Sequence, residues 1–343
     1  MPVMDGRQAE SIRLAAAALR AGALVAFPTE TVYGLGADAS SDAAVAKVFA
    51  AKGRPSDHPL IVHVDDTGNG ADGMAHFAER LPAYAGALMQ AFWPGPLTLI
   101  LHRRAEVGRA AAGGQDSIGL RCPAHPVAQA LLHACRQQGV MGLAGPSANQ
   151  FGRVSPTTAD HVRAEFGAEL LVLDGGPCAV GIESTIVDCT RGEPVLLRPG
   201  VITTEQLRQA CGRRVLDAQE RVAAMPAPRA SGTLEAHYAP KAKVRLMQAR
   251  ALQTALDLLG DDVKPAQQGP VIATYARSSI RSRSSGVLSR RMPDDAASTA
   301  RQLFAVLREF DDKGVKLIWI ETPPDGADWD GVRDRLQRAS AAG

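Results

Sequence analysis

Cysteine is scarce in this sequence and is not arranged in pairs. Five cysteines occur in 343 residues, an odd number, and no C-x-x-C pair is present. Disulfide frameworks and structural zinc sites both need such pairs, so we expect neither. The pattern is typical of a protein of the reducing cytoplasm.

A strong charge of one sign and long apolar runs are also missing. Lysine and arginine number 38 against 36 aspartates and glutamates, a net charge of +2. This balance argues against a nucleic-acid coat or a membrane-surface protein. No segment approaches the ~18 apolar residues of a membrane span, and Arg13 and Arg20 interrupt the alanine-rich N-terminal run. We therefore expect a cytoplasmic protein without a signal peptide or membrane anchor.

Several catalytic motifs are absent as well. The sequence has no G-x-x-x-x-G-K-[ST] phosphate loop, no H-E-x-x-H helix and no G-x-S-x-G elbow. GLGADA from Gly34 lacks the third glycine of a dinucleotide fingerprint. Cys122 lies in an apolar stretch, which is more typical of a small buried side chain than of a nucleophile.

Helical and strand-like patterns alternate through the first part of the chain. Apolar periodicity predicts helices over 8–21, 42–51, 75–91, 125–137 and 203–211. Between them lie strand-like runs, namely ALVAF, HPLIVHV, FWPGPLTLILH, SIGLRCP, VMGLAG and PVLLRPG. This alternation predicts an α/β fold.

The periodicity fades after residue 211. The stretch AAMPAPRASGTLEAHYAPKA, from Ala223, has the Ala-, Pro- and Gly-rich composition of a linker. Strand and helix patterns then resume in VRLMQ, 249–259, PVIATYA, 295–310 and VKLIWIE. We therefore predict a first domain over 1–211, a linker over 212–242 and a second α/β domain over 243–343.

Short polar turns follow many of the predicted strands, where ligand sites gather in α/β sheets. Lys52 and Arg54 lie just past a helix end, where cations also satisfy the last helical carbonyls. Ser147 and Asn149 are also common turn-forming residues. None of these turns identifies a reaction by itself. The turns are TETVYG, KGRPSDHP, DSIGLR, GPSAN, GRVSP, GIEST and LLRPG.

Taken together, the turns and strands resemble the Sua5/YrdC/YciO family of L-threonylcarbamoyladenylate synthases. The resemblance covers about residues 8–211, and HYAP at His237 with a second α/β domain is similar to the longer, two-domain Sua5 type. The stretches in the family's order and spacing are PTETVYGLG, the K-x-R of Lys52 with PLIVHV, WPGPLTLIL, the R-x-P-x-H-P of Arg121, PSAN, DGG, ESTIVD and LLRPG.

The resemblance implies both a fold and a reaction. The fold is a YrdC-like twisted open mixed sheet with helices, followed by a smaller Rossmann-like α/β domain. The reaction joins L-threonine, bicarbonate and ATP into threonylcarbamoyl-AMP and pyrophosphate, for the t6A modification at position 37 of tRNA. A threonine carbamate is then the nucleophile, so the site needs placement and charge stabilisation. Mg²⁺ is expected on the ATP phosphates, with no protein metal ligands, and transfer-complex proteins and tRNA are implied as partners.

The resemblance also implies roles for individual residues. Lys52 and Arg54 would be catalytic, holding the ATP phosphates, and Arg121 would pair with the threonine carboxylate. The implied threonine-binding set is Thr31, His63, Arg121, Gly145 and Ser184, and the implied ATP-binding set is Arg54, His58, Ser117, Ser147, Asn149, Ser155, Arg198 and His237.

The sequence departs from the common family pattern at two places. His58 stands where many relatives carry asparagine, and SGTLEAHYAP stands where a common form reads PGMKYRHYAP. His237 and Tyr238 in this linker predict a lid that folds over the first domain, with His237 touching the nucleotide. The alternative is that the aromatic pair only anchors the first strand of the second domain.

Two other functions compete with this interpretation. A double-stranded RNA- or tRNA-binding module is one, although the near-neutral charge argues against it. The stretch ARSSIRSRSSGVLSRRM, from Ala276, holds five arginines and no acid, as either a solvated loop or a tRNA contact. The other is a carbamoyl-transfer maturation enzyme with a related domain, but such proteins carry C-x-x-C zinc motifs that are absent here.

Overall fold

The chain forms two compact units in the computed structural model, which describes residues 3–217, 220, 227–261, 263–265 and 270–342. One unit comprises Met1–Phe151 with Ser155–Thr233, and the other Gly152–Val154 with Leu234–Gly343. The break after Thr233 falls inside the predicted linker 212–242, of which 218–219 and 221–226 lie outside the described residues.

A mixed sheet of eleven strands runs through the first unit, in the order β1-β8-β2-β3-β7-β4-β6-β5-β9-β10-β11. The pair β4 and β6 is parallel, whereas β2 pairs with β3 and β5 with β6 in antiparallel fashion. The predicted mixed α/β sheet is thus confirmed. The strands are β1 (Val3–Asp5), β2 (Val25–Phe27), β3 (Gly34–Asp38), β4 (Ile61–His63), β5 (Leu97–His102), β6 (Ser117–Arg121), β7 (Leu143–Ala144), β8 (Leu171–Asp174), β9 (Thr185–Asp188), β10 (Val195–Arg198) and β11 (Leu216–Asp217).

Helices cover this sheet with apolar stripes. In α1, Ile12, Ala15, Ala16 and Leu19 recur at helical spacing and pack with α5 against β2 and β8. A second and larger core joins the remaining helices to the central strands. The helices are α1 (Ala9–Arg20), α2 (Asp42–Lys52), α3 (Ala71–Phe77), α4 (Ala83–Phe92), α5 (Pro126–Gln137), α6 (Ala159–Phe166) and α7 (Thr204–Cys211).

The prediction of one helix over 75–91 is wrong. Helix α3 ends at Phe77, and the extended Ala78 forms a bridge with Arg103 beside the sheet. Pro82 then precedes the first residue of α4. Proline has no N–H to donate to a preceding turn and disfavours helical geometry in the residue before it, so the chain restarts a helix there.

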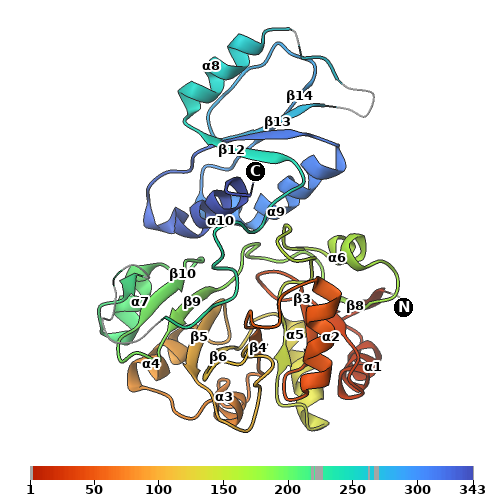
Figure 1. Ribbon diagram of the computed structural model, residues 1–343, viewed down its shortest axis with the longest axis vertical. Coiled ribbons are helices and arrows are strands. Elements are labelled where there is room, and N and C mark those ends of the chain that lie inside the picture. Colours follow the sequence, from red (N-terminus) through yellow and green to blue (C-terminus); the bar gives the residue numbers. More distant parts are fainter. Residues whose placement is uncertain (1–2, 218–219, 221–226, 262, 266–269, 343) are drawn as a thin grey trace. The chain divides into compact units, whose positions relative to one another are not determined.

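The second unit is a four-stranded parallel sheet in the order β12-β15-β13-β14. Helix α8 lies on one face of this sheet, and α9 and α10 lie on the opposite face (Figure 1). This layered arrangement agrees with the predicted smaller α/β domain. The elements are β12 (Lys243–Met247), α8 (Ala249–Leu259), β13 (Ile272–Ala276), β14 (Val287–Arg291), α9 (Ala296–Asp312), β15 (Leu317–Glu321), the 3₁₀ helix Ala327–Trp329 and α10 (Asp330–Ser340).

The core position of Phe77 gives a direct test of this packing. Phe77 is fully buried in the larger core of the first unit. We expect Phe77→Ala to lower the free energy of unfolding by about 3–5 kcal/mol, because a large cavity is left behind. Leu14→Ala is the control, since Leu14 is 39% exposed on α1 and should change stability by less than about 1 kcal/mol. Denaturant unfolding measures both, and equal effects would contradict the assigned core.

Candidate functional site

Arg121 is a buried cation of the first unit, and all three of its guanidinium nitrogens donate hydrogen bonds. It ends β6, and its guanidinium is buried. Nη2 donates to the Glu30 carboxylate at 2.5 Å, Nη1 donates to Thr31 Oγ1 at 2.8 Å, and Nε donates to the Gly95 carbonyl at 3.2 Å. The turn after β2 is thereby joined to the end of β6.

His63 lies beside Arg121 because the two residues are register partners on the parallel strands β4 and β6. Burial, reinforced by the charge of Arg121, lowers the pKa of His63 to about 3, so the ring is neutral at physiological pH. Its Nδ1 has no hydrogen-bond partner among the described residues. A Cβ at Gly145 would lie 2.9 Å from this atom, so only glycine leaves room there without displacing the ring.

Lys52 lies at the end of α2 and is buried. Its Nζ donates to the main-chain carbonyl of Ser147 at 2.6 Å and to that of Asn149. Burial, with the nearby charge of Arg54, lowers the pKa of Lys52 to about 7. The lysine therefore holds the 147–149 turn in place through two main-chain carbonyls.

Arg54 follows the left-handed Gly53 that ends α2. Its Nη2 donates to the Pro59 carbonyl at 2.8 Å and approaches Ser231 Oγ at 3.4 Å. The guanidinium lies over the Phe151 ring, and the His58 ring meets the same ring edge-on. Partial burial and the charge of Arg54 lower the pKa of His58, so this departure from the family pattern favours a neutral ring.

Arg198 and Ser184 form a fourth buried group. Arg198, at the end of β10, donates through Nε and Nη2 to the Ser184 carbonyl at 3.0 and 2.9 Å. Ser184 Oγ also lies 2.8 Å from Thr98 Oγ1. Ser155 Oγ donates to the buried carboxylate of Glu183, the residue before Ser184.

Residues 229–231 pack against this region of the first unit. The Arg229 main chain exchanges two hydrogen bonds with the Gln115 side chain, at 2.8 and 3.3 Å, and Arg229 Nη1 bonds Asp57 at 2.6 Å. The Ser231 carbonyl accepts from Arg198 Nη1 at 2.9 Å. These residues line a pocket together with Ser117, Thr98 and residues 59–61.

The structure thus brings most of the predicted residues together in four hydrogen-bonded groups of the first unit. Sequence reasoning missed the residues that orient them. Of these, Glu30 and Glu183 stand next to assigned residues in TETVYG and GIEST, which is the signal that could have revealed them. The missed residues are Thr29, Glu30, Gly95, Thr98, Gln115, Phe151, Glu183, Arg229 and Ser231.

His237 belongs to the second unit. It is buried, and its ring lies 4.1 Å from that of Tyr238. Tyr238 stacks on Phe304 of α9, and the Arg335 guanidinium lies over its ring. Tyr238 therefore holds the HYAP stretch against helices α9 and α10 of the second unit.

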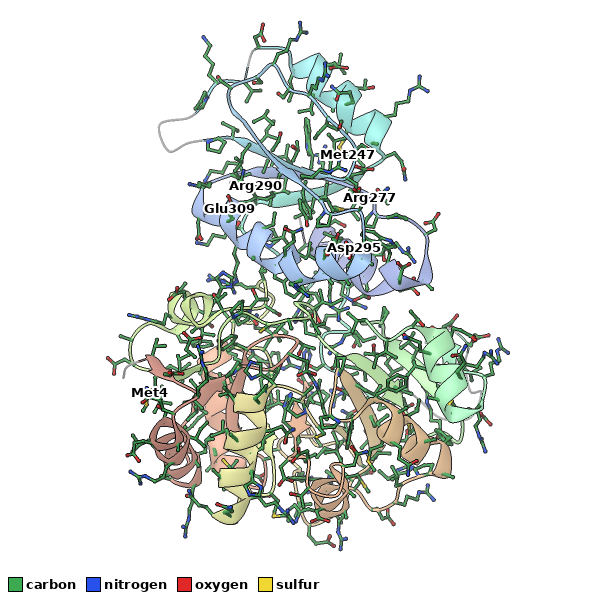
Figure 2. The ribbon with its side chains drawn as sticks, turned by 180° about the vertical axis from the view of Figure 1, so that it is seen from behind. Met4, Met247, Arg277, Arg290, Asp295 and Glu309 are labelled. Atoms are coloured by element: carbon green, nitrogen blue, oxygen red, sulfur yellow. The ribbon has the colours of Figure 1, made fainter. Side chains whose placement is uncertain are left out.

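The arginine-rich stretch of the second unit is partly neutralised. Residues 287–291 form strand β14 rather than a loop. Arg290 forms an ion pair with Glu309 of α9, and both residues are labelled in Figure 2. Arg291 forms an ion pair with Asp294 at 3.0 Å. Arg277 lies 3.8 Å from Glu321 and over the Trp329 ring. The acids come from outside the stretch, so its local sequence overstates its charge.

Two other kinds of feature are absent from the described part of the chain. No group of three or more His, Cys, Asp or Glu side chains there could hold a metal ion. None of the helices in the described ranges is long and apolar enough to cross a membrane.

Comparisons with known proteins identify the family of this chain. The Sua5/YciO/YrdC family model, described as "Telomere recombination", matches residues 17–200, and the model described as "Threonylcarbamoyl-AMP synthase, C-terminal domain" matches residues 202–341. The chain is 36% identical to a threonylcarbamoyl-AMP synthase of Pyrococcus abyssi over 96% of its own length and 94% of that protein. It is also 36% identical to the Bacillus subtilis protein of the same name, over 96% and 92% of the two chains.

A solved structure extends the similarity to three dimensions. It is described as "Crystal structure of P. abyssi Sua5 complexed with L-threonine", and it superposes with a TM-score of 0.83 at 34% identity. The match covers 98% of this chain and 95% of that one. With both family models matched in order along the two units, the chain belongs to the Sua5/YrdC/YciO family, in its two-domain Sua5 form.

Proposed function

We propose that this protein is a threonylcarbamoyl-AMP synthase, a nucleotidyltransferase that makes threonylcarbamoyl-AMP and pyrophosphate from L-threonine, bicarbonate and ATP. The observation that carries the proposal is the grouping of four buried cations in one unit, on residues that match the family motifs. Arg121 with Thr31 provides an amino-acid subsite, and Lys52, Arg54 and Arg198 provide a phosphate subsite. Transfer to tRNA for t6A modification, by further proteins, is part of the same proposal.

The amino-acid subsite suits a small hydroxylated amino acid. Arg121 binds the carboxylate with its planar fork, and Thr31, His63 and Ser184 are neutral groups that hydrogen-bond the rest of the molecule. Gly145 leaves the space that a side chain would fill.

The phosphate subsite supplies positive charge without a covalent nucleophile. The threonine carbamate attacks the α-phosphorus, and Arg54 and Arg198 offset the negative charge that grows there. Lys52 acts indirectly: its Nζ donates to the main-chain carbonyls of Ser147 and Asn149 and so positions these two residues for the nucleotide. In this proposal Mg²⁺ enters on the ATP phosphates, and no residue role above depends on it.

Residues 229–231 support the proposed lid. Ser231 bonds both Arg54 and Arg198, and Arg229 is fastened by Gln115 and Asp57. We assign these residues as the fixed end of a lid over the nucleotide and His237 as its nucleotide contact. We also propose three domain ranges, namely a catalytic domain over 1–211, a linker over 212–242 and a C-terminal domain over 243–343. A cytoplasmic location is part of the same proposal.

Omission of single substrates tests the proposed reaction. We expect pyrophosphate release to need ATP, L-threonine, bicarbonate and magnesium, but no tRNA, because the carbamate is the nucleophile. An enzyme-coupled pyrophosphate assay with each component left out in turn measures this. Undiminished release without threonine would contradict the proposal.

Substitutions in the two subsites should affect different kinetic constants. We expect Lys52→Ala and Arg54→Ala to lower kcat by about 10²-fold or more. Arg54→Ala leaves transition-state charge unstabilised, and Lys52→Ala releases the 147–149 turn that holds Ser147 and Asn149. Arg121→Ala should instead raise the KM for threonine. Arg20→Ala, exposed on α1, is the control for a lost surface charge. Calorimetry in which Arg121→Ala binds threonine as tightly as the parent protein would show that the assignment is wrong.

The lid assignment is tested by hydrogen exchange. Gln115→Ala removes both hydrogen bonds to the Arg229 main chain. One of them protects the Arg229 main-chain N–H, so we expect this N–H to exchange about fivefold faster, as for one lost hydrogen bond of ~1 kcal/mol. Gln209→Ala, exposed on α7, is the matched control.

His237→Ala should weaken nucleotide binding and lower the surviving fraction of free adenylate. Unchanged nucleotide affinity in that variant would leave only the anchoring role.

A further inference from the structure

The hydroxyl groups next to Arg121 have a fixed hydrogen-bond direction. Thr29 Oγ1 lies 2.6 Å from the Val32 carbonyl, which can only accept, so Thr29 donates its proton there. In the Thr29–Thr31 hydroxyl pair, at 2.8 Å, Thr31 must therefore be the donor. Since Thr31 Oγ1 also accepts from Arg121, a further partner of this oxygen has to be a donor.

Three N–H groups of the Arg121 guanidinium already donate to protein acceptors. Of its five N–H groups, one each on Nε, Nη1 and Nη2 is used by Gly95, Thr31 and Glu30. One N–H on each terminal nitrogen is left without a partner among the described residues. Two such N–H groups are what a carboxylate accepts in a bidentate pair.

Glu30 places a buried negative charge beside this fork. Its Oε1 is bound to Arg121 Nη2, and its Oε2 accepts the main-chain N–H of Ala124 at 3.1 Å. The side chains of Glu30 and Arg121 are only 10% and 4% exposed, so water screens the pair weakly. A ligand that brings a carboxylate alone meets a neutralised Arg121, whereas a ligand that also brings an adjacent cation interacts favourably with both charges.

We propose that Glu30, which belongs to neither assigned set, is a specificity-determining residue that makes the Arg121 subsite select zwitterionic α-amino acids over the corresponding hydroxy acids. The inference rests on the proposed function, since it assumes that the amino acid binds at Arg121. Thr31 does not make this distinction, because an α-hydroxyl group donates to its oxygen as well as an ammonium group does.

Calorimetric binding of two ligands tests the proposal in the absence of ATP. The ligands are L-threonine and its α-hydroxy analogue 2,3-dihydroxybutanoate, with the same configuration. Glu30→Gln keeps the shape and an acceptor for Arg121, but it removes the charge and the acceptor of the Ala124 N–H. We expect the preference for L-threonine to fall by about tenfold or more, the effect of one lost charge in a poorly screened site. Glu30→Asp should keep the preference, and Glu10→Gln, at an exposed pair on α1, should behave like the parent protein.

The outcomes separate this inference from the proposed function. A folded Glu30→Gln protein with the parent's preference would overturn the inference alone. If Glu30→Gln does not fold, the Glu30→Asp protein decides, since loss of the preference with the charge retained would also overturn it. A parent protein that binds neither ligand would contradict the proposed amino-acid subsite itself.

Discussion

The burial of positive charge is the constraint on which the rest of the first unit depends. Lys52, Arg54, Arg121 and Arg198 are each less than a tenth exposed, and an uncompensated buried charge costs several kcal/mol. Lys52, Arg54 and Arg198 donate to main-chain carbonyls, and Arg121 is paired with Glu30. The loops that carry these partners are consequently fixed in place. Cations that donate to neutral carbonyls keep their net charge, so this arrangement favours anionic ligands with little reorganisation.

The fold places these cations by bringing distant segments to neighbouring strand ends. Arg121 and His63 are register partners on β6 and β4, while Thr31 reaches them from the turn after β2. Arg198 comes from the end of β10 and meets Ser184, just before β9, because the two strands are antiparallel. The mixed sheet therefore brings a series of weak local motifs together in the candidate site.

Local patterns in the sequence predict much of this fold. The predicted helix over 249–259 has the observed bounds of α8. Helix α2 ends at Lys52, one residue beyond the predicted 42–51, because the residues that cap it, Ser41 and Gly53, are its neighbours in sequence. The helix over 75–91 was mispredicted because its apolar pattern continues across Pro82, where the backbone cannot. Strand β14 was missed because its outer residues are polar and its pairing with β13 is not local.

The candidate site could be predicted only as far as its motifs extend. Family motifs point to Arg121 and Lys52, but the partners of these cations are distant in sequence. Glu30 is 91 positions from Arg121, and Ser231 is 177 positions from Arg54. No spacing rule connects such pairs, since they depend on the complete sheet order.

The central claim is that the Arg121 fork, held by Glu30 and Thr31, is where the carboxylate of the amino acid binds. A crystal structure of this protein with L-threonine tests it most directly. The account predicts both carboxylate oxygens at about 2.7–3.0 Å from Nη1 and Nη2 of Arg121, with the Glu30 contact retained. A threonine carboxylate bound instead to Arg54 or Arg198, with Arg121 contacting only Glu30 and Thr31, would contradict the account.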